Sequence, residues 1–246
     1  MIAEAIALVS LALLSIDDVK RREISEKEYL IALALVVLGK LCDGWLGQDY
    51  FTAPSILVPL YVTVNAMLVG FAAIIAWLRI LGWGDVAVLA LIMAASPAAP
   101  RQGMVFPTVL VTLMYYVTLM LTLGLLNALY NLSLNREDLK KLPWRYRVIY
   151  AFTAKPVEAE VLVKKPSWWY PLNICGKYRL SFNIYMEPSD IVNEVRKALK
   201  KKCIHNASKI WVSYGIPGIP LLSLAYLASL TLGDKLFLNA IEALLK

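Results

Sequence analysis

Three long stretches without a charged residue constrain this chain more than any other feature. They cover residues 50–78, 102–135 and 210–233. Each is longer than the roughly 18–20 apolar residues that cross a bilayer core about 30 Å thick. Only 17% of the 246 residues are charged, whereas soluble domains carry about 25%. The pattern excludes a disordered chain, a small disulfide scaffold and a simple soluble enzyme.

The hydropathy pattern predicts an α-helical polytopic membrane protein with six transmembrane helices. The first segment lacks the basic start and small-residue cleavage site of a secretory signal, so we expect a retained helix, with a cleaved signal peptide as the alternative. In the second, Lys40 and Asp43 lie late enough to reach the membrane surface. The predicted segments are 2–16, 29–46, 55–78, 86–100, 104–130 and 210–232.

Basic residues indicate the orientation, because loops rich in Lys and Arg stay inside. With the N-terminus outside, 21 of the 25 Lys and Arg residues fall in the inner regions 17–28, 79–85 and 131–209. The sequence therefore predicts a multi-pass protein of the cell membrane with both termini outside.

The sequence predicts three parts: a membrane domain (1–130), a small cytoplasmic α+β subdomain between helices 5 and 6 (131–209), and the last helix with its tail (210–246). The subdomain holds 16 basic and 7 acidic residues, which suits anionic lipid headgroups. No nucleic-acid motif accompanies this charge. Alternating patterns predict strands at 157–163 and 178–185, and Asn135 and Ser189 are expected helix caps.

Histidine and cysteine are too sparse to predict a metal site. His205 is the single histidine, and Cys42, Cys175 and Cys203 show no CxxC spacing. We expect a structural role for the Cys203 and His205 pair, and no metal or cofactor.

Two aspartates are expected at the same membrane face: Asp18 after the first segment and Asp85 before the fourth. Two neighbouring carboxyl groups share a proton, so that one activates water and the other donates to a scissile carbonyl. Gly82 and Gly84 flank Trp83 in GWGD, and glycine allows close approach of a substrate backbone. Trp83 could pack against a substrate or anchor the chain at the membrane interface. The simpler interpretation is a glycine loop with Asp85 as a helix cap.

The two motifs together resemble the type IV prepilin peptidases, a family of GxGD aspartic proteases, and more narrowly their archaeal preflagellin (archaellin) peptidase branch. The first motif matches at Asp18, Val19, Lys20, Arg22 and Ile24, and the second at Gly82, Gly84 and Asp85. Residues 209–220 also resemble the start of the family's last helix. The resemblance implies that Asp18 and Asp85 are catalytic, with six membrane helices and a cytoplasmic domain before the last. Ser25 stands where the family often has a proline, and Asp17 is an alternative to Asp18 as the first catalytic residue. The four-cysteine module of the bacterial branch is missing here, so methyl transfer is not predicted.

The resemblance also implies substrates of the prepilin and preflagellin type, whose short basic leader is cut at the cytoplasmic face. Their basic residues could meet the acidic side chains near the first motif, although these also balance neighbouring Lys and Arg residues: Asp17, Glu23, Glu26 and Glu28. Three alternatives remain: a presenilin-type protease, whose other motifs are missing, a transporter using both aspartates as a proton relay, and a structural membrane protein. The oligomeric state is not predicted.

Overall fold

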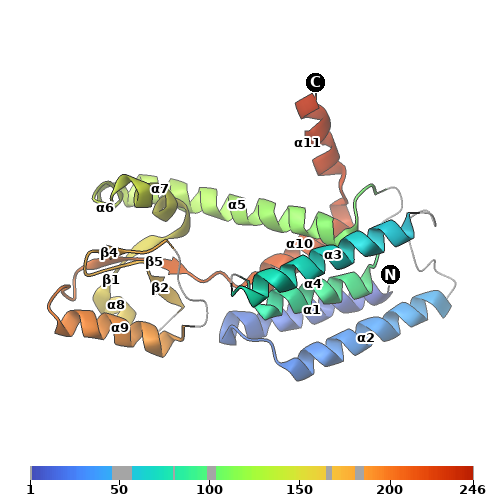
Figure 1. Cartoon of the computed structure of the whole chain (residues 1–246), viewed down its shortest axis with the longest axis horizontal. Helices are drawn as coiled ribbons and strands as arrows, with labels where there is room; N and C mark the ends of the chain where they lie inside the picture. The colour runs from blue at the N-terminus through green and yellow to red at the C-terminus, as the bar shows by residue number, and fades with distance from the viewer. Residues whose placement is uncertain are drawn as a thin grey trace. The chain divides into compact units, whose positions relative to one another are not determined.

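The computed structural model describes residues 2–45, 57–79, 81–98, 104–164, 168–180 and 186–245. The chain is mostly helical and divides into two compact units (Figure 1). Residues 1–119 and 217–246 form the helical unit, and residues 120–216 form the mixed unit.

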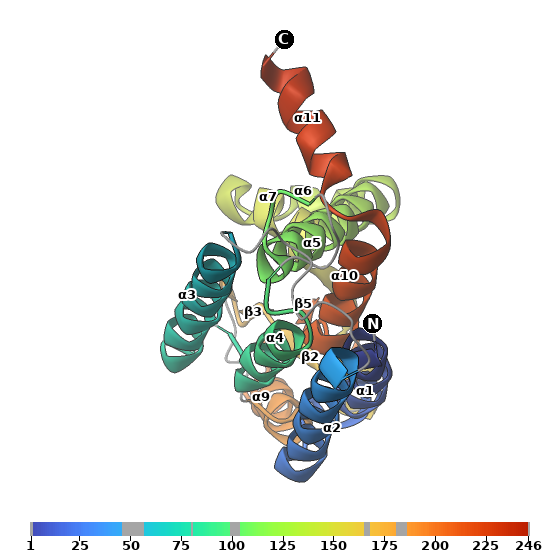
Figure 2. The ribbon, with the colours of Figure 1, turned by 90° about the vertical axis from the view of Figure 1, so that its right-hand side faces the viewer.

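The helical unit is a bundle in which α1 packs against α2, α4 and α10, while α4 also contacts α2 and α3 (Figure 2). Apolar side chains fill the space between these helices, with Leu11, Leu91 and Leu222 almost completely buried. The unit comprises α1 (Ile2–Arg21), α2 (Glu26–Trp45), α3 (Val58–Trp77), α4 (Trp83–Ala95), the first part of α5 (Thr108–Leu134), α10 (Gly218–Leu232) and α11 (Lys235–Leu245).

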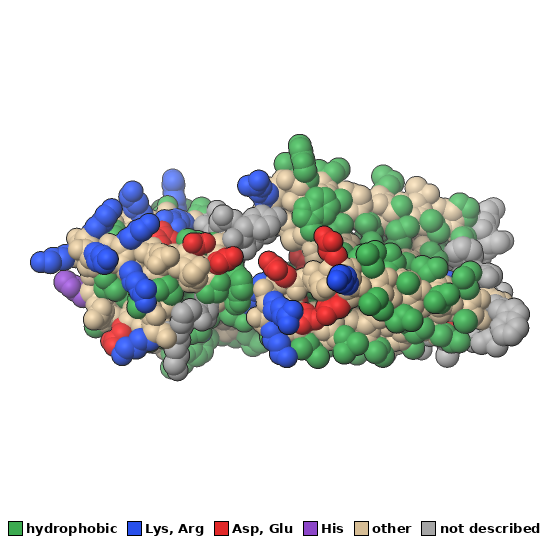
Figure 3. Space-filling model, turned by 90° about the horizontal axis from the view of Figure 1, so that it is seen from below, with side chains coloured by type: hydrophobic (Ala, Val, Ile, Leu, Met, Phe, Trp, Pro, Cys, Tyr) green, Lys and Arg blue, Asp and Glu red, His purple; other side chains and the backbone are tan. Residues whose placement is uncertain are grey.

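On the face seen in Figure 3 most side chains of the helical unit are apolar, with charged side chains at one end, and large side chains such as Leu13, Met67 and Phe71 are more than half exposed. An apolar surface of this size suits contact with a bilayer. Among the described residues, α3 and α5 are long and apolar enough to cross a membrane, and the bent pair α10–α11 adds a third if it counts as one span. Six crossings are therefore not confirmed: α4 has only 13 residues, and α1 and α2 carry charges near their ends.

The last apolar segment differs from its prediction. Residues 209–214 form strand β5 (Lys209–Tyr214), and α10 begins only at Gly218. The apolar residues Ile210, Trp211 and Val212 are buried as part of a sheet, and a short apolar run alone does not separate a buried strand from a helix.

The mixed unit is built on a three-stranded antiparallel sheet with the order β1-β5-β2. In it, Val157 pairs with Ile210 and Tyr170 pairs with Ser213. Helix α9 contributes the buried apolar side chains of Ile191, Val192 and Val195 to this unit. Besides β5 and the end of α5, the mixed unit contains α6 (Arg136–Lys140), α7 (Trp144–Thr153), β1 (Lys155–Glu158), α8 (Ala159–Lys164), β2 (Trp169–Pro171), β3 (Asn173–Ile174), β4 (Lys177–Tyr178) and α9 (Pro188–Lys200).

Several local predictions for the mixed unit need correction. Residues 157–163 change from strand to helix at Ala159. Of the predicted strand 178–185, Tyr178 lies in β4 and residues 179–180 are not in a strand, while 181–185 lie outside the described residues. Helix α9 is capped by Glu187 in a capping box with Asp190, two residues before Ser189, which was the predicted cap. Asn135 does precede α6, but its side chain donates to Asn131 at 2.9 Å instead of capping the helix.

A disulfide joins Cys175 to Cys203 within the mixed unit. Sequence spacing did not predict this pair, because the two cysteines lie 28 residues apart. The pairing gives Cys203 a structural role that does not involve His205.

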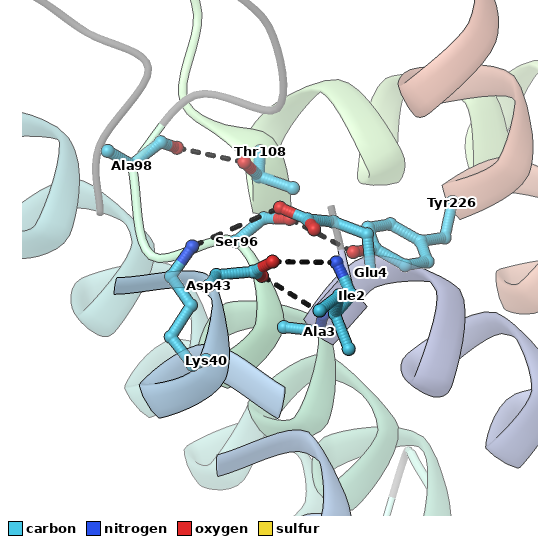
Figure 4. Close-up of polar contacts among 9 residues, drawn as sticks. All are labelled: Ile2, Ala3, Glu4, Lys40, Asp43, Ser96, Ala98, Thr108 and Tyr226. Carbon is cyan, nitrogen blue, oxygen red and sulfur yellow. Dashed lines mark hydrogen bonds and ion pairs between the residues drawn. The ribbon is translucent and has the colours of Figure 1, made fainter. Parts of the chain in front are cut away.

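At the end of the bundle opposite the two motifs, polar groups join α1, α2, α4 and α10 (Figure 4). Asp43 does not reach the surface, because it is 1% exposed and accepts the backbone N–H groups of Ile2 at 2.8 Å and Ala3 at 3.1 Å. It thus caps the start of α1 from a neighbouring helix. Lys40 lies 4.0 Å from Glu4 in the same cluster.

Candidate active site

Asp18 lies in the last turn of α1 with its side chain turned into the bundle, where the residue is 8% exposed. Its Oδ2 accepts a hydrogen bond from the backbone N–H of Ile219 at 3.1 Å, on the first turn of α10. Asp18 lies outside the apolar segment 2–16. Burial raises its pKa above the usual value, while the Ile219 hydrogen bond and the positive charge of Arg22 act in the opposite direction.

Asp85 lies in the first turn of α4, which begins after Gly82. Its backbone N–H donates to the Gly82 carbonyl at 3.2 Å, which closes the turn. It precedes the apolar segment 86–100. Burial raises the pKa of Asp85 to about 6, the negative charge of Asp18 adds to the rise, and a hydrogen bond from the Gly82 backbone opposes it. A like charge nearby disfavours ionisation, so each carboxyl group affects the other.

The start of α10 touches both aspartates. Ile219 binds Asp18 through its N–H, and a Cβ placed on Gly218 would overlap the Asp85 carboxyl group, with Cγ only 3.0 Å away. The Ile219 side chain is 2% exposed, and its Cδ1 lies 3.8 Å from a Cβ built on Gly84. Gly218 and Ile219 were not predicted as site residues, although the resemblance at residues 209–220 was the available signal.

The motif glycines do not use an unusual backbone conformation. Gly82 has φ −76° and ψ 144°, and neither it nor Gly84 has a positive φ. Gly84 instead allows a close approach, because its Cβ would lie 3.1 Å from Cδ1 of Ile24 in the first motif. Trp83 is 55% exposed and packs against neither aspartate in the contacts described.

The basic residues of the first motif lie in different environments. Lys20 is exposed on the last turn of α1. Arg22 is partly buried, follows α1 with φ 60°, and donates its backbone N–H to the Asp18 carbonyl at 3.0 Å. The positive charge near Asp18 therefore comes from Arg22.

Asp17 faces away from the pair. A shallow pocket between α1 and α2 is lined by Asp17, Arg21, Glu23, Ile24, Ser25 and Glu28. The pKa of the exposed Glu28 is raised, chiefly because its side chain shares a hydrogen bond with Asp17. Asp17 therefore interacts with Glu28, whereas Asp18 interacts with Asp85.

Metal ligands do not gather in the part of the chain that the structure describes: no group of three or more His, Cys, Asp or Glu residues could hold an ion there. Tyr116 on α5 packs against the same apolar core as Ile219. The described chemistry is thus that of two carboxyl groups between α1, α4 and α10.

Residues 146–235 match the family model of the archaeal peptidase A24 C-terminus, type II. This part of the chain is therefore similar to the C-terminal part of archaeal A24 peptidases, the family of prepilin and preflagellin peptidases. The matched residues run from α7 to the start of α11 and include Gly218 and Ile219. A search of curated proteins found no match to the chain.

Proposed function

We propose that this chain is an A24-type peptidase: a membrane aspartic endopeptidase that removes the short basic leader of prepilin- or preflagellin-like proteins at the cytoplasmic membrane face. One observation carries the proposal. Asp18 and Asp85, which come from different helices and from the two motifs, share a buried site against the start of α10.

Two carboxyl groups in one site can hydrolyse a peptide bond without a metal. The ionised member takes a proton from water, whose oxygen attacks the scissile carbonyl carbon. The protonated member donates its proton to the carbonyl oxygen. The tetrahedral intermediate then collapses, the C–N bond breaks, and the leaving amine takes a proton from the site. Burial favours this chemistry, because the raised pKa of Asp85 keeps one proton on the pair under mildly acidic conditions.

The substrate class follows from the family and the setting. A leader followed by an apolar helix would place its cleavage site where the helix enters the membrane. Both aspartates lie beside the ends of apolar segments, α1 and α4. No described contact favours the proton-relay alternative over this one.

Asparagine variants in a membrane cleavage assay with a leader-bearing pilin-like substrate test the proposal. Asp18→Asn and Asp85→Asn should each reduce cleavage to background, because asparagine keeps the shape but cannot act as base or acid. The double variant should be no worse than either single one, since groups that act as a unit are not additive.

Asp17→Asn is the matched control, because it is the neighbouring carboxylate and contacts Glu28 instead of the pair. It should keep most of the activity. Full activity in Asp85→Asn would remove the protease proposal. A dead Asp17→Asn beside an active Asp18→Asn would move the first motif by one residue.

A further inference from the structure

The start of α10 treats the two aspartates differently, although it reaches both with adjacent residues. Asp18 receives a directed hydrogen bond from the Ile219 N–H. Asp85 meets Gly218, where the missing side chain leaves space for its carboxyl group. Asp18 therefore has a hydrogen-bond donor, whereas Asp85 has space for its carboxyl group.

The first turn of a helix stabilises an anion, because its N–H groups lack partners within the helix and the helix dipole is positive there. Pro217 precedes α10 and Pro220 lies in its first turn, so neither competes with Ile219 as a backbone donor. The Ile219 donor therefore favours the ionised form of Asp18.

The other charged groups around the pair act in the same direction. Arg22, at the end of α1, adds positive charge near Asp18. Asp85 on α4 has the negative charge of Asp18 beside it and is deeply buried, although it lies at the start of its own helix. Tyr116 on α5 packs against the same core as Ile219, and the interactions described for the pair include no charged group on α10.

We propose that Gly218 and Ile219 are positioning residues that make the pair unequal: Ile219 holds Asp18 as the ionised base, and Gly218 lets Asp85 serve as the protonated acid. This assignment rests on the proposed peptidase function and deepens it by giving each aspartate a separate role. Two residues of the segment 209–220 thereby become part of the catalytic arrangement by positioning the aspartates.

Ile219→Pro tests the donor, because proline removes the N–H and is tolerated in the first turn of a helix. We expect the acidic limb of the kcat/KM profile to move up by about one pH unit, since the ionised base loses its hydrogen bond. The basic limb should stay in place. Ile219→Val keeps the N–H and is the matched control: whatever its rate, both limbs of its pH profile should stay at the wild-type positions.

Gly218→Ala tests the other half of the proposal and decides the question if Ile219→Pro does not fold. The added Cβ overlaps the Asp85 carboxyl group. We therefore expect kcat to fall by roughly tenfold or more, because small misplacements of a catalytic group are costly, and the basic limb of the pH profile to move. Gly70→Ala is the control, because no atom lies within 4 Å of a Cβ there. If both variants only scale the rate, or if Ile219→Pro moves the basic limb, the assignment is wrong.

An infrared titration separates this proposal from the peptidase function. At a pH of about 5, below the raised pKa of the buried acid, the wild-type protein should show a protonated carboxyl signal that Asp85→Asn removes and Asp18→Asn retains. The reverse result overturns the assignment even if cleavage is observed. If the infrared result is as expected but no leader-bearing substrate is cleaved, the peptidase function is rejected and the unequal protonation of the two aspartates is still supported.

Discussion

At the scale of single residues, a buried carboxyl group costs stability when it ionises. The pKa of Asp85 lies at about 6, well above the usual 3.8, chiefly because of burial. The folded state therefore holds its proton more tightly than the unfolded state does between these two values. The same arrangement that supplies the acid for catalysis is expected to weaken the fold at neutral pH.

Asp85→Asn should consequently stabilise the protein at pH 7 and leave it unchanged below about pH 4. A raised acid pKa lowers the stability of the wild-type protein as pH rises from about 4 to about 6, on the order of 2–3 kcal/mol for two pKa units. Asparagine does not titrate and avoids this loss. Thermal unfolding in detergent at both pH values measures it. A wild-type protein that gains stability relative to Asp85→Asn as pH rises would contradict the burial argument.

At the scale of helices, small residues bring α1 and α2 together. A Cβ on Gly39 of α2 would lie 2.8 Å from Cδ1 of Ile6 and 3.2 Å from Cα of Ala3 on α1. Close backbone approach of this kind replaces the hydrophobic driving force that helices lack inside a bilayer. Asp43 then caps α1 one turn further along α2, so packing and capping reinforce each other.

Gly39→Val should destabilise the helical unit by about 1–3 kcal/mol, because overpacking forces the two backbones apart. Gly70→Val on α3 is the matched control, since a Cβ there meets nothing within 4 Å. Thermal unfolding of both variants in detergent is the measurement. Equal losses at the two positions would show that the cost comes from the helix and not from the α1–α2 contact.

At the scale of the whole molecule, the two units have different surfaces. The helical unit exposes apolar side chains, and basic residues are spread over the mixed unit (Figure 3). The Cys175–Cys203 disulfide bears on which side of the membrane the mixed unit occupies, because disulfides are rare in cytosolic proteins except in some hyperthermophiles. The orientation predicted from the basic residues therefore needs a direct measurement.

Labelling of single cysteines in intact cells measures the orientation directly. Arg136 on α6 and Lys235 on α11 are both exposed, and a Cys42→Ser background removes the free thiol. With both termini outside, a membrane-impermeant maleimide should label Lys235→Cys in intact cells and Arg136→Cys only after lysis. The opposite pattern would invert the orientation and place the mixed unit outside.

The sequence by itself indicated a membrane protein and singled out the two aspartates as the candidate pair. Charge-free runs specify a membrane protein because hydropathy is a local property, and the spacing of each motif distinguished Asp18 from Asp17 without any contact. These are the features that neighbouring residues along the chain determine.

Only the tertiary structure decided what those residues meet. The Ile219 donor lies 201 residues from Asp18, and hydropathy cannot say which helix ends converge. The same reason explains β5, the disulfide and the Asp43 cap. An apolar run is compatible with either a strand or a helix, and a cysteine or a buried aspartate acquires its role from a partner distant in sequence. Local pattern sets which residues avoid water, but long-range packing sets which of them meet.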